Sequence, residues 1–365
     1  MSFEGVSDEL DHPGGETDSV TLTSPTTLPE KYQSSSSSHH KEEALEATSS
    51  QSSDASSVCE NSMTSDSSDT RWIGKGFPVQ DKYKNRPQAA TPVGSHSLEY
   101  RMNHKKRGLA LIVVYEIFGG SGPLRRECAQ SDVKTTVRAF QHLGFETKEH
   151  WNLKGQDLKR VLKEVAATDH SQNDALAVIF MSHGGLNEKN NREYICVYDG
   201  TVDTSVLWKN FTAEKCPTLA GKPKMFFIQA CRGESTDKGI QLNKQKGLRV
   251  STDSFDLREK EDYVIPIHAD MLMMWASYPG MFAFKSKNFG VKGSVFIHFL
   301  CQVLLENSLH DDLATLLLRV TREVAIKYES YVPGNSIWHS NKQIPYTVST
   351  LMRKVYFFER NKFIV

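Results

Sequence analysis

The sequence predicts an α/β protein built on an open, mostly parallel β-sheet. Its most apolar segments are short, are apolar on both faces and end at glycine or at a polar turn, which is typical of parallel strands covered by helices. Amphipathic segments with helical spacing lie between them. Because the two kinds of segment alternate along the chain, we expect helices to cover a central sheet.

The predicted strands are four apolar runs bounded by glycine, proline or polar residues. They lie at residues 108–118, 175–185, 223–233 and 271–280. A β-rich run at 346–358 is expected to be an edge strand that pairs with a second copy of the chain, because a free apolar edge promotes aggregation. Residues 194–201 are expected to form a short hairpin.

The predicted helices are four amphipathic segments. They lie at residues 131–144, 155–169, 294–309 and 311–330. In the first, Val133, Val137 and Phe140 share one face, and Gly144 ends the pattern. In the second, aliphatic residues repeat at helical spacing, at Leu158, Val161, Leu162 and Val165.

The first part of the chain differs in composition from the rest. Residues 1–95 are rich in Ser, Thr, Asp, Glu and His and have almost no aliphatic periodicity. Such a segment cannot bury enough apolar surface to offset chain entropy, so we predict that this Ser/Thr-rich leader is disordered. The remainder of the 365 residues has a globular pattern.

Charge and cysteine content exclude several classes of protein. The chain has 44 Lys and Arg residues and 44 Asp and Glu residues, so no net field favours nucleic acid or a membrane surface. No window has the ~18 apolar residues of a spanning helix, and the N-terminus is acidic, unlike a signal peptide. The six cysteines form no CxxC pair and no zinc-type spacing with histidine. We therefore expect a soluble, cytoplasmic protein with free thiols, without a structural metal or cofactor.

Two reactive side chains stand at the ends of predicted strands. His183 follows the apolar run that begins at residue 175, and Cys231 follows the run that begins at residue 223. In open α/β sheets, reactive groups gather beyond the carboxyl ends of the strands, so these two should meet there. An imidazole can take the proton of a thiol and activate it as a nucleophile. The amides of Gly184 and Cys231 are then candidates for an oxyanion hole.

The alternatives to these roles are structural. His183 would be an ordinary core histidine, and Cys231 a core cysteine at a strand end. The glycine-rich run at 119–122 lacks the Lys-Ser/Thr that follows a phosphate loop, so we do not interpret it as one. The other cysteines of the globular part are interpreted as structural, at Cys128, Cys196, Cys216 and Cys301.

The pentapeptide QACRG, with a histidine 48 positions before its cysteine, resembles the signature of the caspases. The resemblance covers residues 96–358 and includes the segments MSHGG, LAGKPKMFFIQACRG, IPIHADMLMMWASYPG and KQIPYTVSTL in that order. It implies peptidase family C14 and the caspase-hemoglobinase fold, a three-layer sandwich with a six-stranded, mostly parallel sheet between helices. It also implies a cysteine endopeptidase that cuts after aspartate.

In this family, two arginines and a glutamine hold the substrate aspartate. Arg126, in RECAQSD, matches the first arginine, with Cys128 where a glycine is usual, and Gln229 matches the glutamine. A guanidinium binds a carboxylate through two parallel hydrogen bonds, which is the physical basis for selecting aspartate. A surface ion pair is the alternative for Arg126, because Arg125 is an adjacent candidate.

Lys285 stands where the family places its second arginine. Lysine keeps the charge but lacks the planar fork of arginine, so we expect it to bind the substrate less tightly. The alternative is that Lys285 is an ordinary solvated lysine without a role in binding. Phe282 and Phe284 match the aromatic walls that the family uses for the residue before aspartate. Val295 stands where many caspases carry a tryptophan beside the fourth pocket, so we expect that pocket to be wider or less selective.

The resemblance further implies a zymogen with a large subunit at 96–253, a small subunit at 254–365 and a polar linker at 235–263. We predict self-processing at Asp253, in VSTDS, and at Asp69 of the leader, in DSSDT. The less favoured sites are Asp66, Asp237, Asp256 and Asp262, and an ordinary solvated aspartate is the alternative at each. The leader is similar in composition to those of a few insect caspases.

Two functions remain open from the sequence. The first is an active Asp-specific endopeptidase of the cell-death pathway, acting as a homodimer of large and small subunit pairs. Its partners would be protein substrates, an upstream caspase and inhibitor-of-apoptosis proteins. The second is a weakly active or inactive homologue that regulates another caspase by dimerisation, for which Lys285 is the motive. We favour the first, because a decoy has no physical need to keep Cys231, His183 and Gln229.

Overall fold

The computed structural model describes residues 89, 92–120, 122–187, 189–241, 266–286 and 293–358. The chain divides into two units, residues 1–85 and 86–365, and every described residue belongs to the second. Apart from residues 89 and 92–95, the predicted leader lies outside the described residues.

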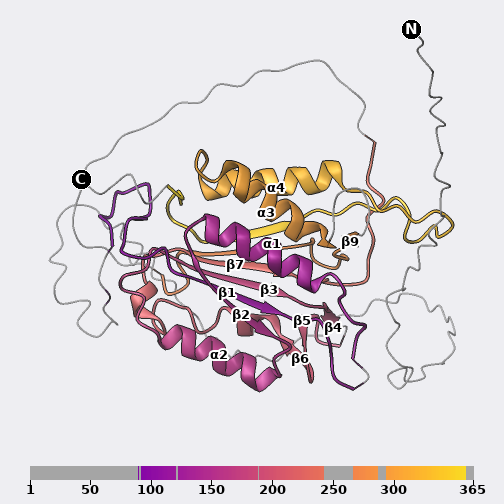
Figure 1. Ribbon diagram of the computed structural model, residues 1–365, viewed down its shortest axis with the longest axis horizontal. Helices are drawn as coiled ribbons and strands as arrows, with labels where there is room; N and C mark the ends of the chain where they lie inside the picture. Colours follow the sequence, from indigo (N-terminus) through magenta and orange to yellow (C-terminus); the bar gives the residue numbers. More distant parts are fainter. Residues whose placement is uncertain are drawn as a thin grey trace, which may run out of the picture. The chain divides into compact units, whose positions relative to one another are not determined.

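A six-stranded sheet forms the centre of the fold (Figure 1). Its strands are β1 (Leu109–Val114), β2 (Glu146–Trp151), β3 (Leu176–Met181), β7 (Lys224–Gln229), β8 (Met271–Trp275) and β11 (Tyr346–Ser349). Their order across the sheet is β11-β8-β7-β3-β1-β2, and only β11 runs antiparallel to its neighbour. This confirms the predicted α/β class with a six-stranded, mostly parallel sheet.

Helices cover both faces of the sheet, which gives three layers (Figure 1). One face carries α1 (Ala129–His142), α3 (Val295–Asn307) and α4 (Leu313–Lys327), and the other carries α2 (Gly155–Ala167). Successive residues of a strand point to opposite faces. In β3, Ile179 therefore packs in the core beneath α1 and α3, whereas Val178 and Phe180 pack in the core beneath α2. The central strands β1, β3, β7 and β8 are buried on both sides along almost their whole length, as their apolar sequences predict.

Shorter elements lie at the edges of this framework. A three-stranded antiparallel sheet joins β4 (Gly184–Asn187), β5 (Arg192–Val197) and β6 (Gly200–Asp203), and it contains the hairpin predicted at 194–201. A two-stranded ribbon joins β9 (Lys285–Ser286) to β10 (Gly293–Ser294). The 3₁₀ turns are η2 (Thr204–Leu207) and η3 (Pro217–Leu219).

Two strands differ from the sequence prediction. Strand β2 was missed because its sequence, ETKEHW, is polar and largely exposed, and backbone pairing with β1 alone makes it a strand. Strand β11 ends at Ser349 rather than continuing to residue 358. Beyond it, Val355 and Phe357 are buried in the core beneath α1 and α3, so this apolar run is not a long free edge. In the part of the chain that the structure describes, no helix has the length and apolar character needed to cross a membrane.

Gly108 is required where the chain enters β1. Its φ is +122°, and a Cβ at this position would lie 1.9 Å from the carbonyl oxygen of Ala175, just before β3. An L side chain therefore cannot be accommodated without separating two central strands. Gly94 is the matched control, because its φ is not positive and a Cβ added to it would have no neighbouring atom within 4 Å.

We expect Gly108→Ala to lower the free energy of unfolding by about 3 kcal/mol, because it combines backbone strain with a clash in the sheet. Gly94→Ala should change it by less than about 0.5 kcal/mol. Urea denaturation followed by circular dichroism measures both values. Equal stabilities for the two variants would contradict this account of the start of β1.

Candidate active site

The pairing of β3 with β7 brings the two reactive side chains to one edge of the sheet. Met181 is in register with Gln229, and the Ser182 amide donates to the Gln229 carbonyl at 2.9 Å. His183 and Cys231 each stand two positions beyond this pair. Parallel strands end at the same edge, so both residues leave the sheet side by side.

Gly184 allows the chain after His183 to approach the nucleophile. A Cβ on Gly184 would lie 2.8 Å from the carbonyl oxygens of both Cys231 and Tyr194, which is too close for any side chain. The backbones of Gly184 and Cys231 are therefore in direct contact. This contact is compatible with the predicted oxyanion hole, although the role of the two amides stays a prediction.

The imidazole of His183 is oriented by a backbone carbonyl. Its Nε2 lies 2.9 Å from the Leu124 carbonyl oxygen. A carbonyl only accepts, so Nε2 carries the proton and the lone pair of the neutral ring is on Nδ1. The Phe118 ring packs against the imidazole, with centroids 5.3 Å apart and a 50° tilt. One segment between β1 and α1 thus holds the imidazole in two ways.

The thiol of Cys231 lies beside the loop that follows β8. The Ala283 amide donates to Cys231 Sγ at 3.4 Å. Burial raises the pKa of Cys231. The hydrogen bond from this amide and the positive charges of Arg126 and Lys285 act in the other direction and lower it, but burial has the larger effect. Burial, followed by the Arg126 charge, lowers the pKa of His183 to about 4, despite its bond to the Leu124 carbonyl. Near neutral pH, thiol and imidazole are therefore both uncharged in this structure.

Arg126 is buried and held by a network of hydrogen bonds. Its guanidinium donates to the Asp132 carboxylate at 3.1 Å, to Ser294 Oγ at 3.3 Å and to the Tyr115 carbonyl at 3.1 Å. Asp132 also accepts from the Ser294 amide at 2.8 Å and from its hydroxyl at 2.6 Å. Arg125 instead forms an exposed ion pair with Glu116 at 2.6 Å. Of the two adjacent arginines, Arg126 is the one built into the site region.

Gln229 and Lys285 come to the same region from other elements. Gln229 is the last residue of β7 and is 5% exposed, and its Oε1 has no hydrogen-bond partner among the described residues. Lys285 is exposed and pairs through β9 with Ser294 of β10, which contacts Arg126. Its charge acts on both Cys231 and His183. The predicted carboxylate-binding residues thus gather around the nucleophile.

The predicted pocket walls have different surroundings. The Phe282 ring meets the Trp338 ring edge-on, with centroids 5.0 Å apart, and the Phe284 ring lies 5.6 Å from that of Tyr328. Val295 is fully buried in the cluster that Phe284 packs against, so its side chain does not reach the surface in this structure. Its predicted place beside a wider fourth pocket stays a prediction.

Leu124 and Trp338 were not predicted from the sequence. The Leu124 contribution is a backbone carbonyl, which leaves no signal in the sequence. Trp338 lies in a loop, and only its contact with Phe282 distinguishes it from an ordinary loop residue.

The remaining described cysteines are free thiols. Cys196, Cys216 and Cys301 are buried, whereas Cys128 is half-buried, with Sγ 3.9 Å from an Arg126 nitrogen. Within the described ranges, no group of three or more His, Cys, Asp or Glu side chains is arranged to hold a metal ion.

Comparison with known proteins decides which family this geometry belongs to. A family model described as a caspase domain matches residues 107–356. The chain belongs to the caspase family. It is 37% identical over 276 residues to caspase-1 of Drosophila melanogaster, covering 76% of this chain and 81% of that protein. It is 33% identical to caspase drICE of the same organism, and the match covers 79% of this chain and 80% of that protein.

Structural comparison agrees with the sequence relatives. The crystal structure of caspase-1 from Spodoptera frugiperda matches with a TM-score of 0.67 and 33% identity, over 76% of this chain and all of that one. As a caspase, the protein is a cysteine endopeptidase. The resemblance carried by QACRG is therefore confirmed, and the likeness of the leader to insect leaders stays a prediction.

The neutral thiol leads to an expected pH dependence. A thiol reacts with iodoacetamide as its thiolate, whose fraction rises with pH. Because the pKa of Cys231 is raised, alkylation of the full-length chain should keep increasing up to and beyond the range of an ordinary thiol. Peptide mass mapping follows the labelled peptide, which Cys231→Ala must remove. A rate already constant at pH 6 would show a preformed thiolate–imidazolium pair instead.

Proposed function

We propose that this caspase is an Asp-specific endopeptidase that acts in apoptosis or proteolytic signalling. The observation that carries the proposal is the buried cation of Arg126, whose guanidinium Asp132 and Ser294 orient and whose charge acts on both His183 and Cys231. Lys285 adds a second positive charge that acts on both reactive groups. When the side-chain carboxylate of a substrate aspartate binds there, the backbone carbonyl of the same aspartate, which is the one to be cleaved, lies next to the Cys231 thiol.

The reaction follows from the orientation of the imidazole. Nδ1 of His183 takes the thiol proton as Cys231 Sγ attacks the scissile carbonyl, and the resulting imidazolium gives that proton to the leaving amine. Water then attacks the thioester, with His183 again as the base, which releases the acid and restores the thiol. The amides of Gly184 and Cys231 stabilise the oxyanion in both steps.

Lys285 provides the sharpest test of aspartate recognition. Restoring a planar fork with Lys285→Arg should raise kcat/KM on tetrapeptides ending in Asp about tenfold, because a bidentate pair replaces a point charge. Peptides ending in Asn should be cleaved at least about a hundredfold more slowly by either form, and Cys231→Ala should abolish cleavage. Equal rates on Asp and Asn peptides would contradict the proposal. A well-folded dimer without Cys231-dependent cleavage would support the alternative, regulation of another caspase by pairing.

We also propose a zymogen whose linker, at 235–263, is cut at Asp253, with the large subunit at 96–253, the small subunit at 254–365 and a further cut at Asp69. Both aspartates lie outside the described residues. Support comes from Asp237, the described alternative. Its carbonyl accepts from the Lys342 amide at 2.7 Å and its carboxylate from the Gly239 amide at 2.8 Å. A backbone held in this way is a poor protease substrate.

Asp253→Ala should prevent the separation of large and small subunits during expression, because the side chain that the enzyme reads is lost. Asp256→Ala should leave separation intact. Gel analysis and N-terminal sequencing of the small subunit identify the cut. A small subunit that begins at residue 257 in the wild-type protein would place the site at Asp256 instead.

The proposed active species is a homodimer of large and small subunit pairs in the cytoplasm. Strand β11 is the outer strand of the sheet, and its Val348 is exposed, which leaves an edge for a second copy. An upstream caspase and inhibitor-of-apoptosis proteins belong to the same proposal as its regulators.

A further inference from the structure

The segment that follows the nucleophile lies between two loops of the small-subunit region. Residues 235–238, here called the strap, form a parallel bridge through Ser235 with Met281 and an antiparallel bridge through Asp237 with Lys342. The Ser235 amide donates to Gly280 O at 3.0 Å, and its carbonyl accepts from the Phe282 amide at 3.0 Å. The strap therefore connects the loop of Phe282 to the chain just after the loop of Trp338.

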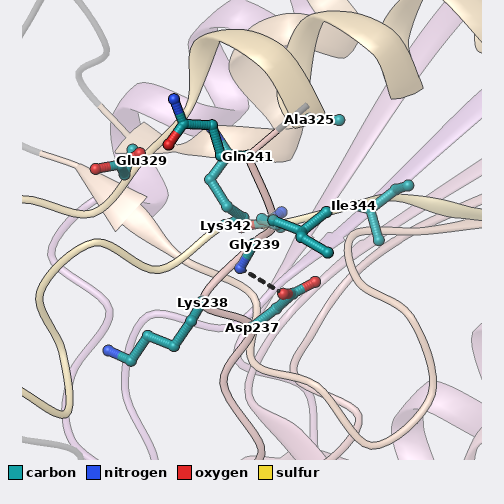
Figure 2. A pocket seen from close by; sticks show the side chains of 10 residues that line it. Asp237, Lys238, Gly239, Gln241, Ala325, Glu329, Lys342 and Ile344 are labelled. Carbon is teal, nitrogen blue, oxygen red and sulfur yellow. Dashed lines mark hydrogen bonds between the residues drawn. The ribbon is translucent and has the colours of Figure 1, made fainter. Parts of the chain in front are cut away.

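The strap ends in a lysine whose ammonium is fully used. Lys238 Nζ donates to the carbonyl oxygens of Ser336, Ile337 and His339, at 2.7, 3.1 and 2.8 Å. An ammonium has three N–H donors, and each has an acceptor here. In Figure 2, the Lys238 side chain points away from those of Lys342 and Ile344, which line the same cavity of about 470 Å³ as Lys238 does. The ammonium at its end is bonded to the loop at 330–341.

The three acceptors surround the residue that carries the aromatic ring. Trp338 stands between Ile337 and His339, and its own carbonyl accepts from Ser330 Oγ at 2.6 Å. The loop at 330–341 thus presents a cluster of carbonyl oxygens, which repel one another unless a cation or donor neutralises them. Lys238 supplies that cation, so it fixes the backbone from which the Trp338 ring meets Phe282.

We propose that Lys238 is a positioning residue that holds Trp338 against Phe282 and thereby sets the preference for the substrate residue before aspartate. The inference rests on the proposed function. Lys238 precedes Asp253 in the sequence, so after the proposed cut it belongs to the large subunit while its three acceptors belong to the small one. The lysine then links the large subunit to the pocket loops of the small one.

Kinetics on paired substrates test the role in specificity. Lys238→Met keeps the aliphatic stem but removes the donors, so KM on a tetrapeptide ending in Val-Asp should rise about five- to tenfold, with kcat within about twofold. On the peptide ending in Gly-Asp the change should stay below about twofold, because no side chain uses the aromatic wall. Lys238→Arg should recover most of the affinity, and Lys163→Met, on the exposed face of α2, is the control for loss of a lysine.

A double-mutant cycle shows whether the lysine acts through the tryptophan. Lys238→Met should add almost nothing to the KM defect of Trp338→Leu, because the two residues act as one unit. Additive defects, or equal losses on the Val-Asp and Gly-Asp peptides, would overturn the proposal.

Hydrogen exchange tests the same contact without any activity. In the Cys231→Ala protein, Lys238→Met should speed the exchange of amides in residues 330–341, while Lys163→Met should not. Unchanged exchange in residues 330–341 would refute the positioning role of Lys238, even if the enzyme cleaves after aspartate. If Lys238→Met speeds this exchange but the protein with Cys231 intact cleaves no Asp peptide, the contact is confirmed and the proposed function is refuted.

Discussion

The structure depends on the parallel pairing of β3 with β7. This ladder puts Met181 opposite Gln229, and so delivers an imidazole from one strand end and a thiol from the next. A slip of one residue would exchange the two faces of a strand and move every buried side chain to the wrong core. Both strands are fully buried, so packing on each side enforces the register. The chemistry is therefore positioned by the same contacts that stabilise the fold.

Charge around the nucleophile acts in opposite directions on the two reactive groups. Arg126 and Lys285 favour the Cys231 thiolate, yet they disfavour the His183 imidazolium that must form when the proton moves. A substrate carboxylate compensates these cations where it binds. Under the proposed function, the bound aspartate would therefore remove part of the electrostatic cost of proton transfer, and recognition would be coupled to activation of the thiol.

The sequence was most informative where burial is complete. Strands β1, β3, β7 and β8 were predicted because residues apolar on both faces leave few alternatives to a covered parallel sheet. It was least informative where backbone groups decide the structure, as in β2, whose polar residues carry no strand signal. For the site, residue types and spacing identified His183 and Cys231, but only the structure separates Arg126 from Arg125, through Asp132 and Ser294. The contact of Trp338 with Phe282 could be identified only from the structure of the loop.

The group that orients His183 belongs to the main chain, and this has an evolutionary consequence. Any amino acid at position 124 would present the same carbonyl oxygen, so point mutation cannot delete it. Drift in the identity of that residue is therefore tolerated by the proton-transfer apparatus, whereas gaining or losing a residue between Phe118 and Leu124 would displace the acceptor. Selection here therefore acts on the number of residues in the connection and hardly at all on which amino acid stands at position 124.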